Sequence, residues 1–369
     1  MILRGNSVTP QHSDNMKVLF SGGGTMGSVM PLLALKDDLQ KEKAEFLWIG
    51  TKKGPEKDVV EKAGVEFKGI SAGKLRRYFT FKNFAIPFLM TCGFFQSFFA
   101  ILKFKPDIIL TAGGFVCVPV VHAGWILRKK IIVHQQDLKV GLANKIMKAF
   151  ATKVTVSFEE LKKYFSKKKV VVTGNPVRKM IFSGSKDSAV QRFGIEPNLP
   201  TLLIMGGGTG ALAINKLVRQ ILANLVEFCQ VIHITGRGKS AFAKASADRQ
   251  PRYHMFEFLH DEIADAYAAA TLVVSRAGFG ALTELSALGK PTILIPLPNN
   301  DQLNNSTYFA SKEAVVVLNQ ANLTDEKFLS YIKKVLHDPN KLGLLSHNIK
   351  QMMPEDSNKK YIDLINKII

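Results

Sequence analysis

Two segments of the chain repeat one design, a short apolar strand followed by a glycine-rich turn and an amphipathic helical run. The first begins KVLFSGGGTMG at Lys17 and continues to Leu39, and the second begins TLLIMGGGTGA at Thr201 and continues to Leu222. A strand that passes through such a turn into a helix is typical of the start of a doubly wound α/β domain. The pattern occurs twice, so the sequence predicts two such domains, which the length of 369 residues also favours.

Further apolar runs of strand length follow each repeat, and helical patterns separate most of them. They cover residues 45–49, 107–110, 131–134 and 153–157 in the first half, and 231–235, 253–258, 272–275, 292–296 and 314–318 in the second. Continuous apolar strands that alternate with helices indicate parallel sheets covered on both faces. We therefore expect an α/β protein with two Rossmann-like domains that face a cleft and are joined near residues 173–178. Ligands of such sheets bind outside the carboxyl ends of the strands.

The excess of positive charge lies almost entirely in the first half of the chain. The formal net charge is +20, and residues 1–180 hold 30 Lys and Arg against 13 Asp and Glu, whereas residues 181–369 hold 20 against 17. This asymmetry points to an anionic partner, such as nucleic acid, an anionic membrane or a phosphorylated substrate.

Residues 1–15 lack an apolar core, so we expect no secretory signal. The three cysteines are widely spaced, which fits free thiols in a reducing compartment.

Residues 74–105 combine an apolar run with flanking cations. Residues 84–102 contain no charged side chain, and nine phenylalanines lie among the cations Lys74, Arg76, Arg77, Lys82, Lys103 and Lys105. This composition suits a helix that lies on an anionic membrane surface. A buried core helix and a true membrane span are the alternatives. Aromatic residues of one type in an uncharged run do not suit a nucleic-acid groove, so we expect no nucleic-acid partner.

The first glycine-rich turn, Gly22-x-Gly24-x-x-Gly27, matches the dinucleotide-binding fingerprint. A nicotinamide enzyme normally has an acidic residue after the second strand, but that region reads WIGTKK. This counts against NAD and leaves NADP open through Lys52 or Lys53. The second turn lacks the fingerprint spacing. Two such loops facing one cleft favour one domain for each of two phosphate-bearing substrates.

The segment VVSRAGFGALTELSALGKP, residues 273–291, predicts a nucleotide site. A strand ends at Ser275, and Arg276 with the small residues after it forms a turn into a helix. The N-terminus of that helix can hold a diphosphate through its N–H groups and its dipole. Glu284 lies further along the helix and offers two acceptor oxygens for a ribose diol. The alternative is a surface helix with a capping turn.

At these motifs the chain resembles the bacterial N-acetylglucosaminyltransferases of peptidoglycan synthesis, which convert undecaprenyl-pyrophosphoryl-muramoyl-pentapeptide to its disaccharide form. The resemblance runs along nearly the whole chain from about Lys17. It covers the glycine-rich turns and the segments 71–77, 112–115, 134–137, 174–178, 258–269, 276–291 and 302–305. It implies a two-domain glycosyltransferase fold of the B type, with no cofactor.

The resemblance also implies a role for each part of the chain. Residues 1–15 would be a disordered extension, 16–173 the domain that faces the acceptor and the membrane, and 174–345 the domain that binds UDP-N-acetylglucosamine. Residues 346–369 would form a helix packing back on the N-terminal domain. The expected location is the cytoplasmic face of the cell membrane, with residues 74–105 as the docking face.

Carried over by position, the resemblance assigns donor contacts. Leu259 would meet the uracil through its backbone, Glu284 would take the ribose, and Gln302 would read the sugar hydroxyls. Arg178 would lie near the donor at the hinge. The diphosphate would be held in the helix turn by Phe279, Gly280, Ala281, Leu282 and Thr283. From the other domain, Thr25, Met26 and Gly27 would close on the donor or acceptor phosphates.

The chain departs from the family pattern at four positions. Ser28 stands in place of a histidine, and the usual His-Glu-Gln-Asn reads His134-Gln-Gln-Asp137. Gly208 replaces a serine of the second loop, which removes a hydroxyl contact to phosphate. Asp301 replaces the histidine before Gln302.

The implied chemistry is transfer with inversion, in which an acceptor hydroxyl displaces UDP from the anomeric carbon. It needs a base for the hydroxyl and charge stabilisation for the departing diphosphate. Ser28 is a catalytic candidate by position only, since a serine or a glutamine is no base near neutral pH. We expect Asp137 to be the base, with His134 orienting it or serving instead. The alternative is a polar cluster that caps the helix at 141–149.

Helix N-termini and Arg276 or Arg178 would stabilise the charge of the diphosphate. The sequence has no DxD or His/Cys cluster, so we expect no obligatory metal.

Three other functions compete with this interpretation. A related transferase would act on another lipid, such as diacylglycerol. A sugar-nucleotide epimerase on a similar scaffold would release UDP without a lipid acceptor. A UDP-sugar-binding protein without turnover is kept open by Ser28 and Gln135.

Overall fold

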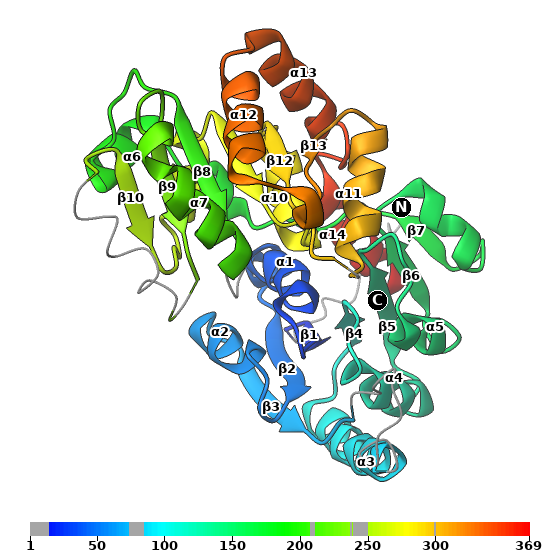
Figure 1. The fold of residues 1–369 in the computed structure, drawn as a ribbon. Helices are drawn as coiled ribbons and strands as arrows, with labels where there is room; N and C mark the ends of the chain where they lie inside the picture. Colours follow the sequence, from blue (N-terminus) through cyan, green and yellow to red (C-terminus); the bar gives the residue numbers. More distant parts are fainter. Residues whose placement is uncertain (1–14, 74–84, 207–210, 237, 239–249, 299) are drawn as a thin grey trace, which may run out of the picture.

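The computed structural model describes residues 15–73, 85–206, 211–236, 238, 250–298 and 300–369. The expected N-terminal extension, the basic segment at 74–84 and Gly208 fall outside these ranges, apart from residue 15. Figure 1 shows two lobes, each built around one sheet.

Seven parallel strands form the sheet of the N-terminal domain, in the order β3-β2-β1-β4-β5-β6-β7. The strands are β1 (Lys17–Ser21), β2 (Glu45–Thr51), β3 (Glu66–Ile70), β4 (Ile108–Thr111), β5 (Lys130–Gln135), β6 (Lys153–Val156) and β7 (Val170–Val172). The helical segments between them are η1 (Met26–Ser28), α1 (Met30–Lys41), α2 (Glu56–Lys62), α3 (Ile86–Phe104), α4 (Cys117–Ile126), α5 (Leu142–Met147) and η3 (Glu159–Tyr164).

Six parallel strands form the sheet of the C-terminal domain, in the order β10-β9-β8-β11-β12-β13. The strands are β8 (Thr201–Met205), β9 (Gln230–Ile234), β10 (Tyr253–Phe256), β11 (Leu272–Ser275), β12 (Thr292–Leu294) and β13 (Val316–Val317). The helical segments that precede, connect or follow them are η4 (Lys179–Phe182), α6 (Lys186–Phe193), α7 (Leu212–Leu225), α9 (Ile263–Ala269), α10 (Phe279–Leu288), α11 (Gln302–Ser311), η5 (Gln320–Asn322), α12 (Asp325–Leu336), α13 (Pro339–Lys350) and α14 (Ser357–Ile368). Two parallel α/β sheets confirm the predicted fold class.

The carboxyl ends of β1 and β8 lie where the strand order of each sheet reverses. In the first sheet β1 lies between β2 and β4, and in the second β8 lies between β9 and β11. All five residues of β8 and four of the five in β1 are buried. Both faces of these central strands are covered, which explains their continuous apolar sequences. Crevices at such reversal points are the usual ligand sites of open α/β sheets.

Helix α14 follows the whole C-terminal domain along the chain but packs on the N-terminal one, as Figure 1 shows in red. Its side chains Tyr361, Leu364 and Ile365 join the same buried cluster as Val18 and Phe20 of β1. This helix therefore ties the two lobes together a second time, beside the linker at 173–178.

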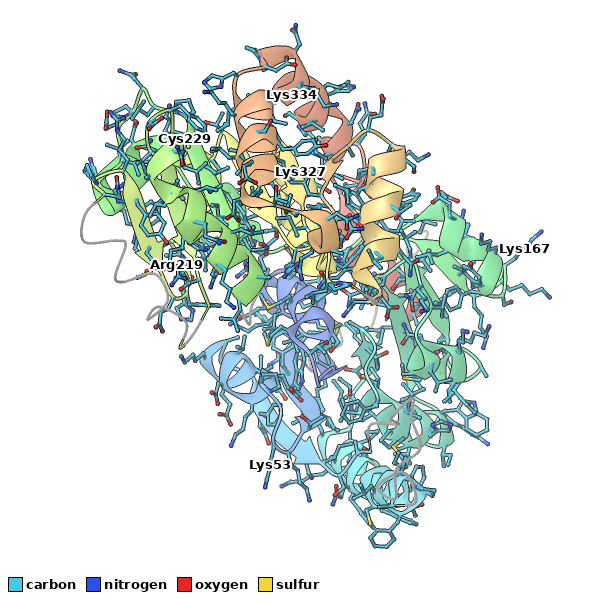
Figure 2. The ribbon with its side chains drawn as sticks, in the orientation of Figure 1. Lys53, Lys167, Arg219, Cys229, Lys327 and Lys334 are labelled. Carbon is cyan, nitrogen blue, oxygen red and sulfur yellow. The ribbon has the colours of Figure 1, made fainter. Side chains whose placement is uncertain are left out.

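Charged side chains cover both lobes, and Figure 2 shows Lys53 and Lys334 near opposite ends of the molecule. Lys53 follows β2 in an exposed turn, and Lys334 lies on α12.

Candidate active site in the interdomain cleft

The first glycine-rich turn is held by hydrogen bonds to its backbone. The indole Nε1 of Trp48 donates to the carbonyl of Gly22 (3.0 Å), and the Ser28 hydroxyl lies within hydrogen-bond distance of the carbonyls of Gly23 (3.3 Å) and Thr25 (3.1 Å). Ser28 is buried, so its hydroxyl is engaged inside the loop. At the family's histidine position, the structure thus has a side chain that fixes the loop.

A buried carboxylate, that of Glu56 at the start of α2, lies beneath this turn. It accepts hydrogen bonds from the N–H of Gly24 (3.2 Å) and from the N–H (2.7 Å) and hydroxyl (2.5 Å) of Thr51. A Cβ added to Gly23 would lie 2.2 Å from Glu56 Oε1. The glycine at this position therefore makes room for a carboxylate of the protein itself.

The segment 134–137 includes the last two residues of β5 and contacts that turn. Gln136 Nε2 donates to the carbonyl of Gly27 (2.9 Å), and Gln135 Nε2 donates to the carbonyl of Asp137 (2.6 Å). His134 is buried, with Nδ1 2.9 Å from the Thr155 hydroxyl and Nε2 2.7 Å from Asn175 Oδ1. Burial lowers the pKa of His134 to about 4, although its hydrogen bonds act in the opposite direction. His134 is thus neutral near pH 7, and both of its nitrogens are engaged.

Asp137 reaches across the cleft to the C-terminal domain. Its Oδ1 accepts a hydrogen bond from Asn305 Nδ2 on α11 (3.1 Å). Burial raises the pKa of this carboxyl group, the hydrogen bond from Asn305 lowers it, and the charge of Asp301 raises it. Asp301 itself pairs with Lys139 at the exposed rim (3.2 Å). Asp137 is therefore a partly buried carboxylate whose proton affinity is increased, as a general base near neutral pH requires.

The N-terminus of α10 faces the same cleft. The Phe279 ring at its first position packs edge-on against Phe158 of the N-terminal domain, with 5.5 Å between centroids. A Cβ added to Gly280 would have no heavy atom within 4 Å, so the turn has open space beside it. Backbone N–H groups at a helix start that borders open space can bind a diphosphate.

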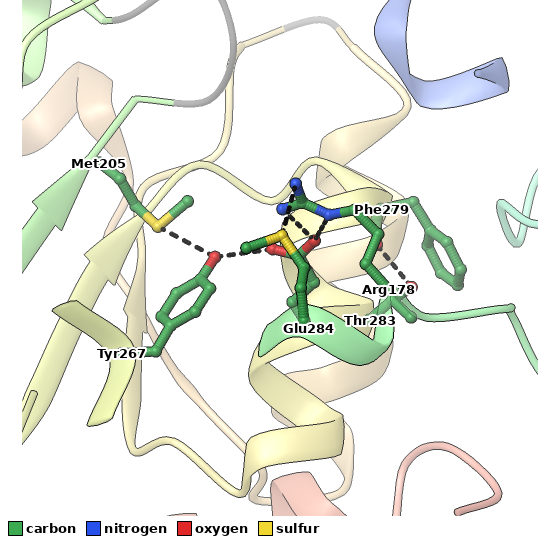
Figure 3. A network of polar contacts seen from close by, with 7 residues as sticks. Arg178, Met205, Tyr267, Phe279, Thr283 and Glu284 are labelled. Carbon is green, nitrogen blue, oxygen red and sulfur yellow. Dashed lines mark hydrogen bonds and ion pairs between the residues drawn. The ribbon is translucent and has the colours of Figure 1, made fainter. Parts of the chain in front are cut away.

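Glu284 is fully engaged in this structure, as Figure 3 shows. Its Oε1 accepts hydrogen bonds from Arg178 Nε (2.8 Å) and Nη2 (2.7 Å), and its Oε2 accepts one from the Tyr267 hydroxyl (2.9 Å). Burial and the neighbouring carboxylate raise the pKa of Tyr267 well above its usual value, so this phenol remains a donor. The structure therefore brings Arg178 and Glu284 together, as an ion pair across the hinge.

The other expected donor contacts lie around the C-terminal domain's side of the cleft. Leu259 is buried before α9. Arg276 is also buried, which lowers its pKa, and its Nη1 donates to the carbonyl of Ile295 (2.8 Å). At the start of α11, Gln302 Oε1 accepts the N–H of Leu297 (3.1 Å). Arg276 and Gln302 thus both hold the segment between β12 and α11.

The space beside the Arg178–Glu284 ion pair is small. The pocket lined by Met30, Arg178, Glu284 and the linker holds about 10 Å³, which is room for about one water molecule. A nucleotide needs several hundred Å³. A ligand that contacts Glu284 therefore requires the Arg178 side chain to move.

Three residues at the centre of the cleft were not among the predicted site residues. Asn175 lies in the linker, Asn305 faces Asp137, and Tyr267 donates to Glu284. Asn175 and Asn305 belong to segments 174–178 and 302–305, which carried the family resemblance, so a signal for them was present. Tyr267 lies in α9, within segment 258–269, which also carried the resemblance. Among the described residues, no three His, Cys, Asp or Glu side chains are grouped to hold a metal ion.

Two domain families match the chain along most of its length. The glycosyltransferase family 28 N-terminal domain matches residues 18–156, and the glycosyltransferase family 28 C-terminal domain matches residues 201–364. The first match spans strands β1 to β6 except for Lys17, and the second spans strands β8 to β13.

Curated relatives are similar over nearly their whole length. A Bacillus cereus protein is 38% identical over 341 residues, which cover 91% of this chain and 96% of the relative. Its name is UDP-N-acetylglucosamine–N-acetylmuramyl-(pentapeptide) pyrophosphoryl-undecaprenol N-acetylglucosamine transferase 2. A Legionella pneumophila transferase of the same name, without the number, is 36% identical over 353 residues, covering 94% of this chain and 96% of its own.

Solved structures share the fold. MurG from Acinetobacter baumannii superimposes with a TM-score of 0.74 at 24% identity, covering 95% of this chain and 99% of its own. A UDP-GlcNAc 2-epimerase from Neisseria meningitidis bound to UDP-GlcNAc superimposes with a TM-score of 0.69 at 14% identity, covering 95% and 100%. At these identities the superpositions show the fold alone.

Proposed function

The chain belongs to glycosyltransferase family 28, and we propose that it transfers N-acetylglucosamine from UDP-N-acetylglucosamine to undecaprenyl-pyrophosphoryl-muramoyl-pentapeptide. It is a hexosyltransferase of peptidoglycan precursor synthesis. Similarity over 91% of the chain to a transferase of this activity carries the assignment. The site adds a nucleotide-type helix N-terminus on one domain and a carboxylate with a raised pKa on the other.

In the proposed reaction, the acceptor hydroxyl attacks the anomeric carbon of the donor from the side opposite UDP. The bond between that carbon and the diphosphate oxygen breaks, and UDP leaves with the electron pair. Asp137 takes the proton of the hydroxyl. The contacts that support this role are its place in the cleft and its hydrogen bond with Asn305. His134 is not a contact partner of Asp137, and its low pKa favours a structural role.

The donor would bind mainly to the C-terminal domain. The free N–H groups at the start of α10 would hold the diphosphate, Leu259 the uracil, and Glu284 the ribose. Arg178 pairs with Glu284 in this structure. We infer that the arriving diphosphate attracts Arg178 away from Glu284, which frees Oε1 for a ribose hydroxyl.

A UDP-release assay tests the function directly. The purified protein is incubated with UDP-N-acetylglucosamine in detergent, with and without a lipid-pyrophosphoryl-muramoyl-peptide, and free UDP and products are measured. We expect UDP release that depends on the acceptor, together with a disaccharide product. Release without the acceptor would indicate an epimerase or a hydrolase. Binding of UDP-N-acetylglucosamine without release of UDP would indicate a binding protein without turnover.

For the acceptor side, we propose that α3 docks on the inner face of the cytoplasmic membrane. By length and composition alone, this 19-residue helix could cross a bilayer, with a mean hydropathy of 1.4. One face packs on the domain, since Gly93, Ser97, Ala100 and Ile101 are buried. A Cβ on Gly93 would lie 2.1 Å from the carbonyl of Ser71. Such close packing supports a helix that lies along the protein rather than one that leaves it.

The opposite face of α3 is exposed and apolar. Phe88 (71% exposed), Phe95 (53%) and Phe99 (64%) recur at helical spacing. Helix α3 packs on α4 and α4 on α5, and these helices expose Trp125, Ile126, Leu142 and Ile146. Exposed lysines and an arginine flank these helices at positions 103, 105, 128 and 145. The proposed docking face therefore extends beyond residues 74–105 to α4 and α5.

A liposome assay checks this docking face. Replacing Phe95 and Phe99 together by serine should weaken binding to vesicles that contain anionic lipid by roughly tenfold or more, because two exposed aromatic side chains no longer enter the acyl boundary. The matched control is Tyr331→Ser, which removes an exposed aromatic side chain from α12 of the other domain. Equal vesicle binding by both variants would show that α3 is not part of the docking face.

A further inference from the structure

A chain of hydrogen bonds crosses from the N-terminal sheet to α10 through the linker. The Thr155 hydroxyl on β6 lies 2.9 Å from His134 Nδ1 on β5, and His134 Nε2 lies 2.7 Å from Asn175 Oδ1 in the linker. Asn175 Nδ2 donates to the Thr283 hydroxyl (2.7 Å), and that hydroxyl donates to the carbonyl of Phe279 (2.9 Å).

The links of this relay all point in one direction. Asn175 donates through Nδ2, so its Oδ1 is the acceptor and His134 Nε2 carries the hydrogen. Nδ1 of His134 then accepts from Thr155. This arrangement needs a neutral histidine, and burial, which lowers the pKa of His134 to about 4, keeps it neutral. Every donor in the relay has an acceptor.

The central side chains of the relay are also buried. His134 is 1% exposed, Asn175 2% and Thr283 3%. A broken link would leave a polar atom buried without its partner, which is costly in such surroundings. The relay therefore resists separation of the elements that it joins.

We propose that this relay fixes the two domains in the arrangement needed for transfer, which makes Asn175 a positioning residue. The proposal rests on the proposed transferase function. One end of the relay lies in the turn at 279–283, which would hold the donor diphosphate, and its member His134 lies three residues before Asp137. A fixed separation between these ends places the anomeric carbon against the base, and small displacements there lower the rate strongly.

The hydroxyl of Thr283 takes part in positioning and not in donor binding. Its hydroxyl accepts from Asn175 and donates to Phe279, so its hydrogen is already used. The other proposed UDP contacts, Leu259 and Glu284, lie on the C-terminal domain alone. Loss of the relay should therefore slow transfer and leave the affinity for UDP unchanged.

The test uses Thr283→Val, which keeps the shape of the side chain, and Asn175→Ala, which removes both central links. We expect kcat to fall roughly tenfold or more in each, and the Kd for UDP, measured by calorimetry, to stay within about twofold. The double variant should be no slower than the slower single variant, because both substitutions break one unit. The control is Tyr253→Phe, which deletes a 2.8 Å hydrogen bond to the buried His233 inside the C-terminal sheet. It should change neither kcat nor Kd.

A parallel loss of UDP affinity would overturn the proposal, since these residues would then be donor contacts, and so would an unchanged kcat. Hydrogen exchange gives a readout that does not need turnover and separates this proposal from the proposed function. If the wild-type protein does not transfer sugar, the proposed function fails, but the relay still predicts faster amide exchange in both 134–137 and 279–284 of Thr283→Val. Faster exchange confined to 279–284 would overturn the relay.

Discussion

Replacing Asp137 with asparagine is expected to lower the kcat of sugar transfer by roughly 10²- to 10⁴-fold, the usual contribution of a general base. Asparagine keeps the size of the side chain but cannot accept the acceptor's proton. The Kd for UDP should stay nearly constant, because the proposed nucleotide contacts lie on the other domain. Steady-state kinetics with saturating donor and acceptor, together with calorimetry for UDP, measure both quantities. Near-native turnover of this variant would show that Asp137 is not the general base.

The pH dependence of kcat supplies a second signature of the same residue. Burial raises the pKa of Asp137, and the nearby charge of Asp301 raises it as well. The base is active when deprotonated, so wild-type kcat should fall as the pH drops through this raised pKa. Asp301→Asn is the matched control, because it removes a carboxylate whose partner, Lys139, is exposed. It should keep near-native kcat at neutral pH and move the acidic limb to lower pH.

Glu284→Gln is expected to weaken UDP binding by roughly 10- to 100-fold, because hydrogen bonds to a charged group contribute about 1.5–3 kcal/mol. Glutamine keeps one acceptor oxygen and replaces the other by a donor. It also leaves Arg178 without its anionic partner. Calorimetric titration with UDP measures the loss.

A comparison of ligands separates the ribose contact from the broken ion pair. Wild-type protein should bind UDP more tightly than 2′-deoxy-UDP, and Glu284→Gln should lose most of that difference. If the variant binds both ligands more weakly by the same factor, Glu284 acts through Arg178 and does not contact the ribose. The two ligands share every other group, so the cycle isolates the 2′-hydroxyl.

Central elements were predictable from the sequence because burial leaves a continuous apolar pattern. Strands β1, β8 and β11 stand where the sequence placed them, and so does the helix after Arg276. Strands β3 and β7 were not predicted. β3 reads EFKGI with alternating exposure at the edge of its sheet, and β7 has three half-buried residues after a run of lysines. Edge strands bury one face or less, so they lack the apolar run that marks a central strand.

The partners of the site residues could not be predicted in the same way. Asn175 is 108 positions from Thr283, and Asn305 is 168 positions from Asp137, so these pairs exist only because the domains are placed as they are. Local sequence likewise gives no sign that Gly23 makes room for Glu56. The glycine-rich fingerprint suggested phosphate binding at this turn, but the N–H of its Gly24 donates to the protein's own carboxylate.

The return of α14 to the N-terminal domain constrains the order of folding during synthesis. The buried cluster around β1 includes Tyr361, Leu364 and Ile365, which a ribosome adds only after the entire C-terminal domain. Until then, Val18 and Phe20 lack part of their apolar cover, and Asn358 cannot yet bind the linker at Val177. The N-terminal domain is therefore synthesised first but completed last. Its apolar surface is exposed in the interval, and such surface is what chaperones bind.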